Sequence, residues 1–378
     1  MRVKLKDIFD LQMGKTPSRS NLEYWNTTDY KWISIADLTK TSKYIFETKE
    51  YLSKSAIKDS GIKVIPANTV VMSFKLSIGK TAITKEDMYS NEAIMAFKDK
   101  HVINIIPEYI FYLFKYKNWE ECSNKAVMGK TLNKATLSEI EVEICSIEKQ
   151  RQIVNILDKI MSAVDGRKQE LQLLDELIKA RFVEMFGDCT NMISLSDLCL
   201  IITDGTHQSP KFQHEGIPFI LVSNLSKNTV TYDTDKFISA ETYKELYKRT
   251  PIEIGDILLS TVGSYGHPAV VVEDRKFLFQ RHIAYLKPKS DILNSYYMHG
   301  ALLSPGCQRQ IEEKVKGIAQ KTLNLSEIRK IRIPVPSLDL QKQYADFVHQ
   351  VNKSKVAVQK ALDETQILFD SLMQKYFG

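Results

Sequence analysis

The tripeptide Gly-Lys-Thr occurs three times, beginning at Gly14, Gly79 and Gly129, and it suggests phosphate binding. A P-loop needs another glycine five residues earlier, because backbone N–H groups along the whole loop wrap the phosphates. In this chain those earlier positions are occupied by Phe9, Phe74 and Asn124. All three copies therefore fail the requirement, and the sequence argues against nucleotide binding.

Other catalytic patterns are also incomplete. Methyl transfer to an amino group of DNA would need a cofactor-binding glycine loop and an [Asp/Asn/Ser]-Pro-Pro-aromatic motif, and the sequence has neither. A Mg²⁺-dependent nuclease would place Pro-Asp upstream of Glu-x-Lys, and the triplets at Glu47 and Glu312 lack it. The seven histidines show no His-x-x-x-His spacing and the five cysteines no Cys-x-x-Cys, so neither zinc nor a disulfide framework is indicated. We expect a chain with no catalytic residue, cofactor or metal of its own.

The remaining candidates are glycine-containing loops that carry hydroxyl groups and cations, which are groups that bind phosphate oxygens and base edges. They form three pairs, one member in each half of the chain: 14–19 with 204–211, 74–80 with 261–267, and 128–131 with 317–322. The candidate contact residues are Lys15, Thr16, Arg19, Lys75, Lys80 and Lys130 in the first half, and Thr206, His207, Lys211, Ser264, Tyr265, His267, Arg281 and Lys321 in the second. A polar surface turn would explain any one of them, whereas the paired set favours recognition.

These loops are paired because the chain repeats itself once. Phe186-Gly187 returns 191 residues later as Phe377-Gly378, and the segment 68–73 returns 187 residues later as 255–260. A period this long indicates a duplicated module rather than a solenoid of short units. Two similar but unequal modules suggest a protein that recognises two different things.

Two segments, 147–187 and 338–378, lack proline and have an apolar residue every three or four positions. With alternating spacings of 4 and 3, eight of ten positions from Ile153 to Met185 are apolar, and so are eight of ten positions 191 residues later. Such a heptad stripe predicts coiled-coil helices. Each would be about 60 Å long, too long to lie only on its own module. We predict that the two helices pair antiparallel, with a globular module at each end.

Within the modules, short β-rich runs such as 31–35 and 257–260 alternate with helical stretches at 107–119 and 295–303. Strands outnumber helices at irregular spacing, which favours an α+β fold over a regular α/β winding. We therefore predict two similar mixed α/β modules separated by a long antiparallel two-helix coiled coil, with pseudo-twofold symmetry. The predicted boundaries are 1–146 for the first recognition module, 147–187 for the central helix, 188–336 for the second module and 337–378 for the C-terminal helix.

The composition is that of an ordinary folded protein, with 378 residues, 43% hydrophobic residues and a net charge of +6. The excess positive charge lies in the two modules, while the two helical segments are neutral, which permits basic patches for nucleic acid without demonstrating them. No apolar run of about 18 residues occurs and the first residues lack the apolar core of a signal peptide. We expect a cytoplasmic protein without a membrane partner.

This organisation resembles the specificity (S) subunit of type I restriction-modification systems. The resemblance covers the whole chain: two modules, each followed by a long helix, with Gly-Lys-Thr-Pro and Asp-Gly-Thr-His openings at Gly14 and Asp204. The second helix follows Ile333-Pro334-Val335-Pro336 and then Gln341, while the first copy, before Gln150, lacks the prolines. The missing prolines affect only the first boundary; the resemblance itself rests on the same order of motifs occurring twice.

The resemblance implies a non-catalytic subunit that reads a bipartite, asymmetric double-stranded DNA sequence, one half-site per module, with the helices acting as a ruler for the spacer. It implies two modification (methyltransferase) subunits as partners, joined by motor-nuclease subunits. S-adenosylmethionine, ATP and Mg²⁺ are then expected in those partners. The candidate loop residues become predicted DNA contacts. The alternative is a scaffold that presents two interaction modules to protein ligands and binds no DNA, and a neighbouring gene for an N6-adenine methyltransferase would argue against it.

Overall fold

The computed structural model describes residues 1–75, 77–119, 124–126, 129–317 and 321–378, with the backbone only for 124–126 and 129–131. The chain divides into two compact units. Unit 1 comprises Met1–Gly166 and Leu362–Gly378, and unit 2 comprises Arg167–Ala361. Each unit therefore contains one globular module and parts of two long helices. Among the described residues, no helix combines the length and the apolarity that crossing a bilayer requires.

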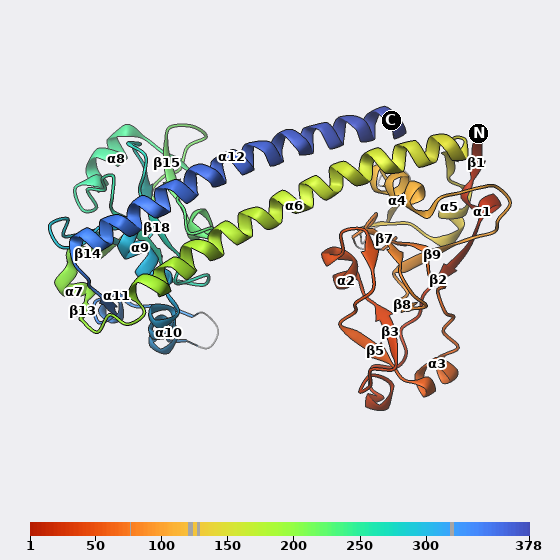
Figure 1. Cartoon of the computed structure of the whole chain (residues 1–378), viewed down its shortest axis with the longest axis horizontal. Coiled ribbons are helices and arrows are strands. Elements are labelled where there is room, and N and C mark those ends of the chain that lie inside the picture. Colours follow the sequence, from red (N-terminus) through yellow and green to blue (C-terminus); the bar gives the residue numbers. More distant parts are fainter. Residues whose placement is uncertain (76, 120–123, 127–128, 318–320) are drawn as a thin grey trace. The chain divides into compact units, whose positions relative to one another are not determined.

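The module of unit 1 is built on a five-stranded sheet in the order β2-β9-β6-β7-β4, in which β4 pairs with β7 in parallel and the other neighbours are antiparallel (Figure 1). Beside it lie the three-stranded sheet β5-β3-β8 and the pairs β1-β12 and β10-β11. The strands are β1 (Arg2–Lys4), β2 (Phe9–Met13), β3 (Tyr30–Ile33), β4 (Tyr44–Ile45), β5 (Glu50–Leu52), β6 (Val70–Ser73), β7 (Thr81–Thr84), β8 (Tyr89–Ser90), β9 (Ile94–Asp99), β10 (Asn124–Ala126), β11 (Gly129–Thr131) and β12 (Glu141–Glu143). The helices are α1 (Leu5–Ile8), η1 (Leu22–Tyr24), α2 (Ile35–Lys40), α3 (Lys54–Ser60), α4 (Pro107–Tyr116) and α5 (Lys134–Glu139).

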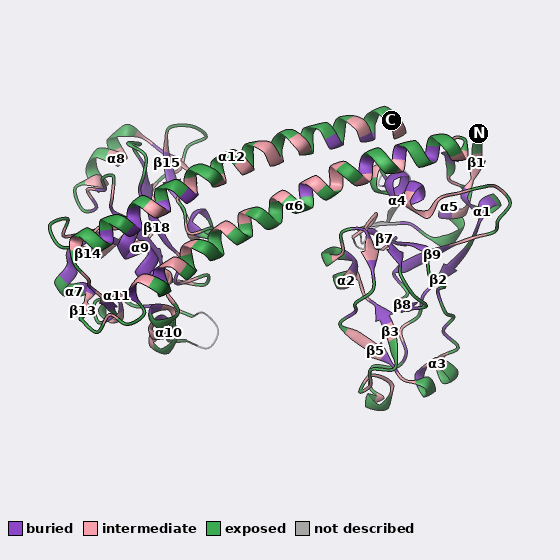
Figure 2. Ribbon diagram, viewed as in Figure 1, coloured by how far each residue is buried: buried purple, intermediate pink, exposed green. Residues whose placement is uncertain are grey.

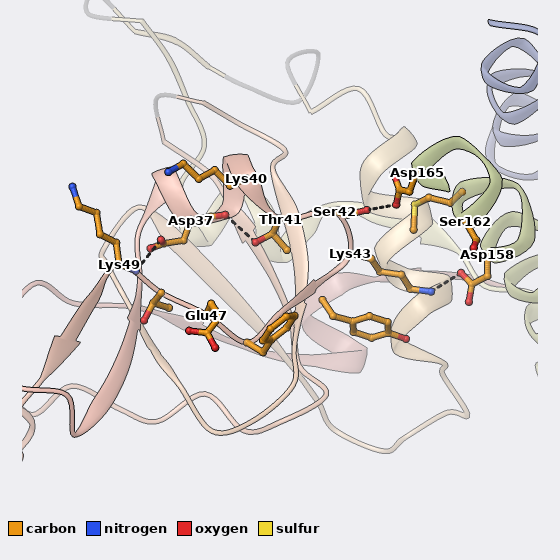
Figure 3. Close-up of a pocket in the computed structure, with 14 residues that line it drawn as sticks. Asp37, Lys40, Thr41, Ser42, Lys43, Glu47, Lys49, Asp158, Ser162 and Asp165 are labelled. Carbon is orange, nitrogen blue, oxygen red and sulfur yellow. Dashed lines mark hydrogen bonds and ion pairs between the residues drawn. The ribbon is translucent and has the colours of Figure 1, made fainter. Parts of the chain in front are cut away.

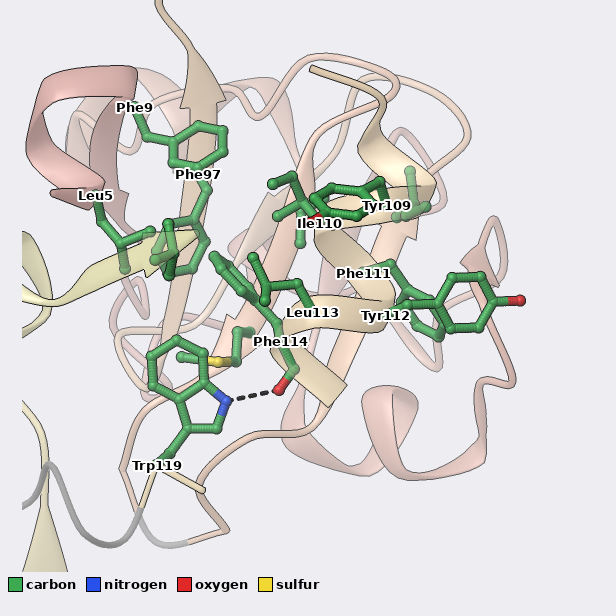
Figure 4. Close-up of a cluster of buried hydrophobic side chains, with 14 of the residues drawn as sticks. Leu5, Phe9, Phe97, Tyr109, Ile110, Phe111, Tyr112, Leu113, Phe114 and Trp119 are labelled. Carbon is green, nitrogen blue, oxygen red and sulfur yellow. Dashed lines mark hydrogen bonds between the residues drawn. The ribbon is translucent and has the colours of Figure 1, made fainter. Parts of the chain in front are cut away.

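Helix α4 forms the centre of the core of unit 1. It begins at Pro107, where proline suits the first helical turn because no N–H is needed there, and it buries six consecutive residues from Tyr109 to Phe114. Phe114 stacks edge-on against Phe97, at 4.7 Å between ring centres, and its carbonyl accepts a 2.7 Å hydrogen bond from the Trp119 indole (Figure 4). The sheet covers part of this helix, and residues of the segments 147–166 and 362–378 belong to the same core and cover the rest.

The module of unit 2 repeats this topology. Its four-stranded sheet β14-β20-β17-β18 corresponds to β2-β9-β6-β7, the sheet β16-β15-β19 to β5-β3-β8, and the pair β13-β21 to β1-β12. The strands are β13 (Met192–Ser194), β14 (Cys199–Asp204), β15 (Ile217–Ile220), β16 (Phe237–Ile238), β17 (Ile257–Ser260), β18 (Pro268–Val270), β19 (Leu278–Phe279), β20 (Ile283–Pro288) and β21 (Arg332–Pro334). The helices are α7 (Leu195–Leu198), η2 (Val222–Leu225), α8 (Ala240–Tyr247), α9 (Ser295–Leu303), α10 (Pro305–Lys314) and α11 (Leu325–Ile328). The predicted class, two similar mixed α/β modules, is confirmed.

Two forty-residue helices, α6 (Ile147–Phe186) and α12 (Leu338–Phe377), follow the modules. In unit 1 the core contains Leu157 near the start of α6 and Phe369 near the end of α12. In unit 2 the core contains Phe186 at the end of α6 and Tyr344 near the start of α12. Within each unit the helices thus run antiparallel, as predicted, and Figure 2 shows buried positions recurring along both.

Two polar residues that interrupt the apolar stripe connect the helices in unit 2. The Arg167 guanidinium donates a 2.8 Å hydrogen bond to the carbonyl of Ala361, and the Lys355 ammonium lies 2.5 Å from a carboxylate oxygen of Asp175. Polar contacts at seam positions favour one register over others, because a shifted pair would leave these groups without partners.

Candidate nucleic-acid interface

In module one the candidate loops are joined by backbone hydrogen bonds at one end of the sheet. The N–H of Gly14 donates to the carbonyl of Ile94 (3.1 Å), and the N–H of Lys15 donates to that of Ser90 (2.8 Å). Phe74 donates to Ala93 at 3.0 Å and accepts from Leu132 at 3.2 Å. The loops that open the module, follow β6 and precede β9 therefore form one surface.

The same set of four backbone hydrogen bonds, which we call the loop frame, recurs in module two. Gly205 donates to Ile283 (3.1 Å) and Thr206 donates to Phe279 (3.0 Å). Thr261 donates to His282 at 2.9 Å and accepts from Leu323 at 2.8 Å. These four bonds correspond to the four in module one, so the paired loops of the sequence are equivalent in three dimensions.

Two glycines make the close approach of the opening loops possible. A Cβ atom at Gly14 would lie 2.2 Å from the carbonyl oxygen of Asn91, and one at Gly205 would lie 2.2 Å from that of Phe279. Backbone cannot move aside as a flexible side chain can. Both modules therefore need glycine where the first loop crosses the sheet end.

The second loop of each module closes on a glycine with a left-handed backbone. Gly79 has φ 88° and Gly266 has φ 81°, a region that other residues rarely adopt. Each donates its N–H at 2.9 Å to the carbonyl of the serine that ends the preceding strand, Ser73 or Ser260. The two loops have the same backbone turn, and they differ in the side chains that they present.

Arg19 is already engaged within module one. It forms a bidentate ion pair with the carboxylate of Glu50, and its guanidinium lies 3.7 Å from the ring centre of Trp25 and 4.9 Å from that of Trp32. Such a stack and bidentate pair hold a guanidinium in one orientation. To contact a base, Arg19 would have to do so in this orientation or give up its contacts with Glu50 and the two tryptophans.

Three other predicted residues of module one also have hydrogen-bond partners within the module. Thr16 donates its hydroxyl proton to Glu92, Lys15 donates to the carbonyl of Ser60, and Lys80 donates to the Thr39 hydroxyl at 2.5 Å. The hydrogen bond from Thr16 lowers the pKa of Glu92, with the charges of Lys75 and Arg19 acting in the same direction. Glu92 therefore stays ionised in the middle of the cationic loops. Lys130 lies outside the residues whose side chains the structure describes.

In module two the opening loop is held by Asp204. Its carboxylate lies 2.9 Å from Nε2 of His207 and 2.6 Å from the guanidinium of Arg249. Beside it lies a hollow of about 270 Å³ whose lining includes Thr261, Arg281 and His282. Burial, reinforced by Arg281, lowers the pKa of His282, so its neutral ring can accept the 3.3 Å hydrogen bond from Arg281 Nε.

Apart from Lys211 at the end of the first loop, the other predicted residues of module two lie on the second and third loops. Tyr265 donates its hydroxyl to Glu312 at 3.2 Å, and Lys321 Nζ lies 3.4 Å from the Tyr265 oxygen. The Nδ1 atom of His267 lies 3.0 Å from Asn228 Oδ1. Lys211 and Ser264 are exposed. The backbone N–H of Gly263 donates to the carbonyl of Lys321 at 3.1 Å, so the second and third loops are joined.

The carboxylates among these cations, most notably Glu92, were not predicted from the sequence. When the two halves are aligned at an offset of 189 residues, Glu92 lies opposite Arg281. This offset falls between the values of 187 and 191 that relate the other repeated segments. The backbone frame agrees with that offset, because Ala93 and His282 accept the equivalent hydrogen bonds. At one equivalent position, then, module one presents a carboxylate and module two a guanidinium.

A second hollow, of about 790 Å³, lies in unit 1 between module one and α6 (Figure 3). At its base the ammonium of Lys43 lies 2.5 Å from Asp158 Oδ1, and the hydroxyl of Tyr112 donates to the same oxygen at 2.5 Å. Ser42 donates to Asp165 of α6 at 3.0 Å. These contacts attach the module to the first half of α6. Nowhere in the described part of the chain do three or more His, Cys, Asp or Glu side chains group closely enough to hold a metal ion.

Two equivalent loop frames with unequal side chains, each on a module that is followed by a long helix, define a duplicated recognition protein. The family model for the type I restriction modification DNA specificity domain matches residues 1–176 and 190–365. The chain belongs to this family.

Individual relatives agree. The type I restriction enzyme MjaIX specificity subunit of Methanocaldococcus jannaschii is 24% identical, over 98% of this chain and 91% of its own length. A crystal structure of a type I restriction-modification S subunit from M. genitalium shares the fold, with a TM-score of 0.56, 14% identity, and coverage of 100% of this chain and 96% of that one. A chain from a structural study of type I R-M complex assembly and conformational transition shares it with a TM-score of 0.58, 18% identity, and coverage of 100% and 97%.

Proposed function

We propose that this chain is the DNA-recognition subunit of a type I restriction-modification complex and reads a bipartite, asymmetric sequence, one half-site per module. The observation that carries the proposal is the repeated loop frame with different side chains, above all Glu92 in one module and Arg281 in the other. Carboxylates accept hydrogen bonds from cytosine N4, whereas guanidinium groups donate to guanine. Equivalent backbones with opposite donor and acceptor chemistry would select different base pairs.

The proposal assigns the long helices to the spacer. Each contains forty residues, which at 1.5 Å per residue corresponds to about 60 Å, or about 17 base pairs of DNA at most. The two half-sites would accordingly lie within one to two helical turns of each other. The antiparallel pairing supports this assignment, because a helix pair resists bending better than a single helix does.

The helices also offer surfaces for the proposed partners, two modification (methyltransferase) subunits. Leu177 on α6 is 46% exposed and Leu368 on α12 is 50% exposed, and these leucines lie 191 residues apart, at the same position of the repeat. Val356 and Ile367 are more exposed still, at 71% and 69%. We assign these exposed apolar side chains to contacts with the partner subunits. Two equivalent leucines suit two copies of one partner.

Catalysis would then belong to the partners. The modification subunits would bind S-adenosylmethionine, and motor-nuclease subunits would use ATP and Mg²⁺, while this chain contributes recognition and assembly. A subunit that selects sites in cellular DNA would act in the cytoplasm.

Alanine substitutions of exposed loop lysines test the assignment of one half-site to each module. Lys15→Ala is expected to alter preference in one half-site and Lys211→Ala in the other. A base contact should cost about 1–3 kcal/mol at one position, whereas a phosphate contact should weaken binding to all sequences alike. Binding of the assembled complex to a panel of single-base variants of its site measures both effects.

The matched control is Lys168→Ala, which removes an exposed lysine from α6 and should leave base preference unchanged. If both loop variants affect the same half-site, or neither affects DNA binding, the assignment of one half-site to each module is wrong. If the assembled wild-type complex binds no DNA, the proposed DNA recognition is wrong and the scaffold alternative is favoured.

A further inference from the structure

A fully buried glutamine lies in the first turn of α6. The amide of Gln150 makes three hydrogen bonds, all to backbone groups of unit 1: Oε1 accepts from the N–H of Ile106 (2.9 Å), and Nε2 donates to the carbonyls of Asn104 (3.1 Å) and Cys145 (3.0 Å). Ile106 immediately precedes α4, and Cys145 lies just before α6. One side chain thus connects the long helix, the segment that leads into it and the start of the central helix of the module.

The second module has an equivalent buried glutamine. Gln341, fully buried in the first turn of α12, accepts from the N–H of Asn294 (2.9 Å) and donates to the carbonyls of Ile292 (3.1 Å) and Pro336 (3.0 Å). Asn294 immediately precedes α9, the counterpart of α4. All three contacts correspond, element by element, to those of Gln150.

The residue type follows from what the buried backbone needs. We call the contact between a module and the start of its long helix the joint. Each joint has one buried N–H and two buried carbonyl groups, and a primary amide supplies one acceptor and two donors in a rigid plane. A carboxylate could accept but not donate, and an apolar side chain would leave three buried polar groups without partners. A tyrosine hydroxyl strengthens each joint: Tyr109 donates to the carbonyl of Glu143 (3.2 Å) and Tyr297 to that of Pro334 (2.6 Å).

We propose that Gln150 and Gln341 are positioning residues that set the angle between each recognition module and its long helix, and thereby the spacer length that the protein accepts. This inference rests on the proposed function. The reason is geometric: a module of about 145 residues is about 35 Å across, so a tilt of about 6° between the module and its helix displaces the far side of the module by about 4 Å, about the rise of one base pair. Selection of one spacer over the next therefore requires joints stiffer than ordinary side-chain packing provides.

The test measures spacer selectivity separately from base selectivity in the assembled complex. Gln150→Met and Gln341→Met keep the length of the side chain and remove the amide. With both half-sites unchanged and the spacer varied one base pair at a time, the wild type should favour one length. Each variant should show a several-fold weaker preference for that length, together with an unchanged order of preference among single-base variants of each half-site.

The matched controls are Gln152→Met and Gln343→Met, which make the same substitution two residues further on, at exposed positions, and should keep wild-type spacer selectivity. Because the buried variants remove three hydrogen bonds, Tyr297→Phe provides a milder version that removes one, and it should broaden spacer selectivity less. Weakening of binding at all spacers alike, with the preferred length kept, would overturn the positioning role while leaving the proposed function intact. A wild-type complex that shows no spacer preference would instead contradict the proposed function.

Discussion

Inserting one heptad into both long helices, after Gly166 in α6 and after Ala361 in α12, is expected to lengthen the recognised spacer and leave both half-sites unchanged. Seven residues add about 10.5 Å, which sets an upper limit of about three base pairs. The gain can be smaller, because each added base pair also rotates one half-site about the DNA axis by about 35°. Seven residues keep the apolar stripe in phase, so the helix pair should still form. Binding of the assembled complex to DNA with stepwise longer spacers measures the shift.

The control is a heptad inserted into α6 alone. It shifts the first part of α6 by seven residues relative to the last part of α12, so Phe369 and Met373 of α12 cannot keep their places in the core of unit 1, and binding should fall at every spacer length. If the double insertion binds well and retains the wild-type spacer, the helices do not measure the distance between half-sites.

Replacing Asp158 by leucine is expected to destabilise unit 1 by about 2 kcal/mol. The Lys43 side chain is only 7% exposed, so removal of its partner leaves a buried charge unpaired. The loss should fall below the 3–5 kcal/mol of a fully buried pair, because Asp158 itself is 41% exposed. All three tryptophans of the chain (Trp25, Trp32 and Trp119) belong to module one. Urea unfolding followed by tryptophan fluorescence therefore measures the stability of this unit.

The double variant Lys43→Met/Asp158→Leu should recover most of that stability, because it removes both charges and leaves apolar side chains. Glu141→Gln, which breaks an exposed ion pair with Arg2, should change the unfolding midpoint little. A single variant as stable as the wild type would show that the Lys43–Asp158 contact does not hold module one against α6.

The features that could be predicted from the sequence are those with a period or a repeat. The heptad stripe depends only on spacing along one helix and predicted that α6 and α12 pair. The order of modules and helices along the chain then predicted the antiparallel direction that both helices have within each unit. The duplication revealed paired loops because strand and glycine positions recur at nearly constant offsets. Gln150 and Gln341 were visible as part of a repeated motif, but their role depends on backbone groups more than 40 residues away, such as those of Ile106 and Asn294.

The candidate site was less predictable because its charges are paired through the fold. Arg19 and Glu50 are separated by 31 residues, and Arg249 and Asp204 by 45, so no local pattern connects them. Only the sheets bring these groups together. As a result, several cations that a sequence presents as free DNA contacts are partly committed to carboxylates, and the difference between the modules lies as much in Glu92 as in the lysines.

We expect the two modules on this chain to read two halves of a split DNA sequence. Sequencing the methylated adenines in DNA incubated with the chain and its modification subunits tests this expectation directly. Methylation should occur within one sequence of two specific parts separated by a spacer of constant length and variable composition. Methylated adenines in a single uninterrupted sequence, or the same methylation when this chain is left out, would contradict it.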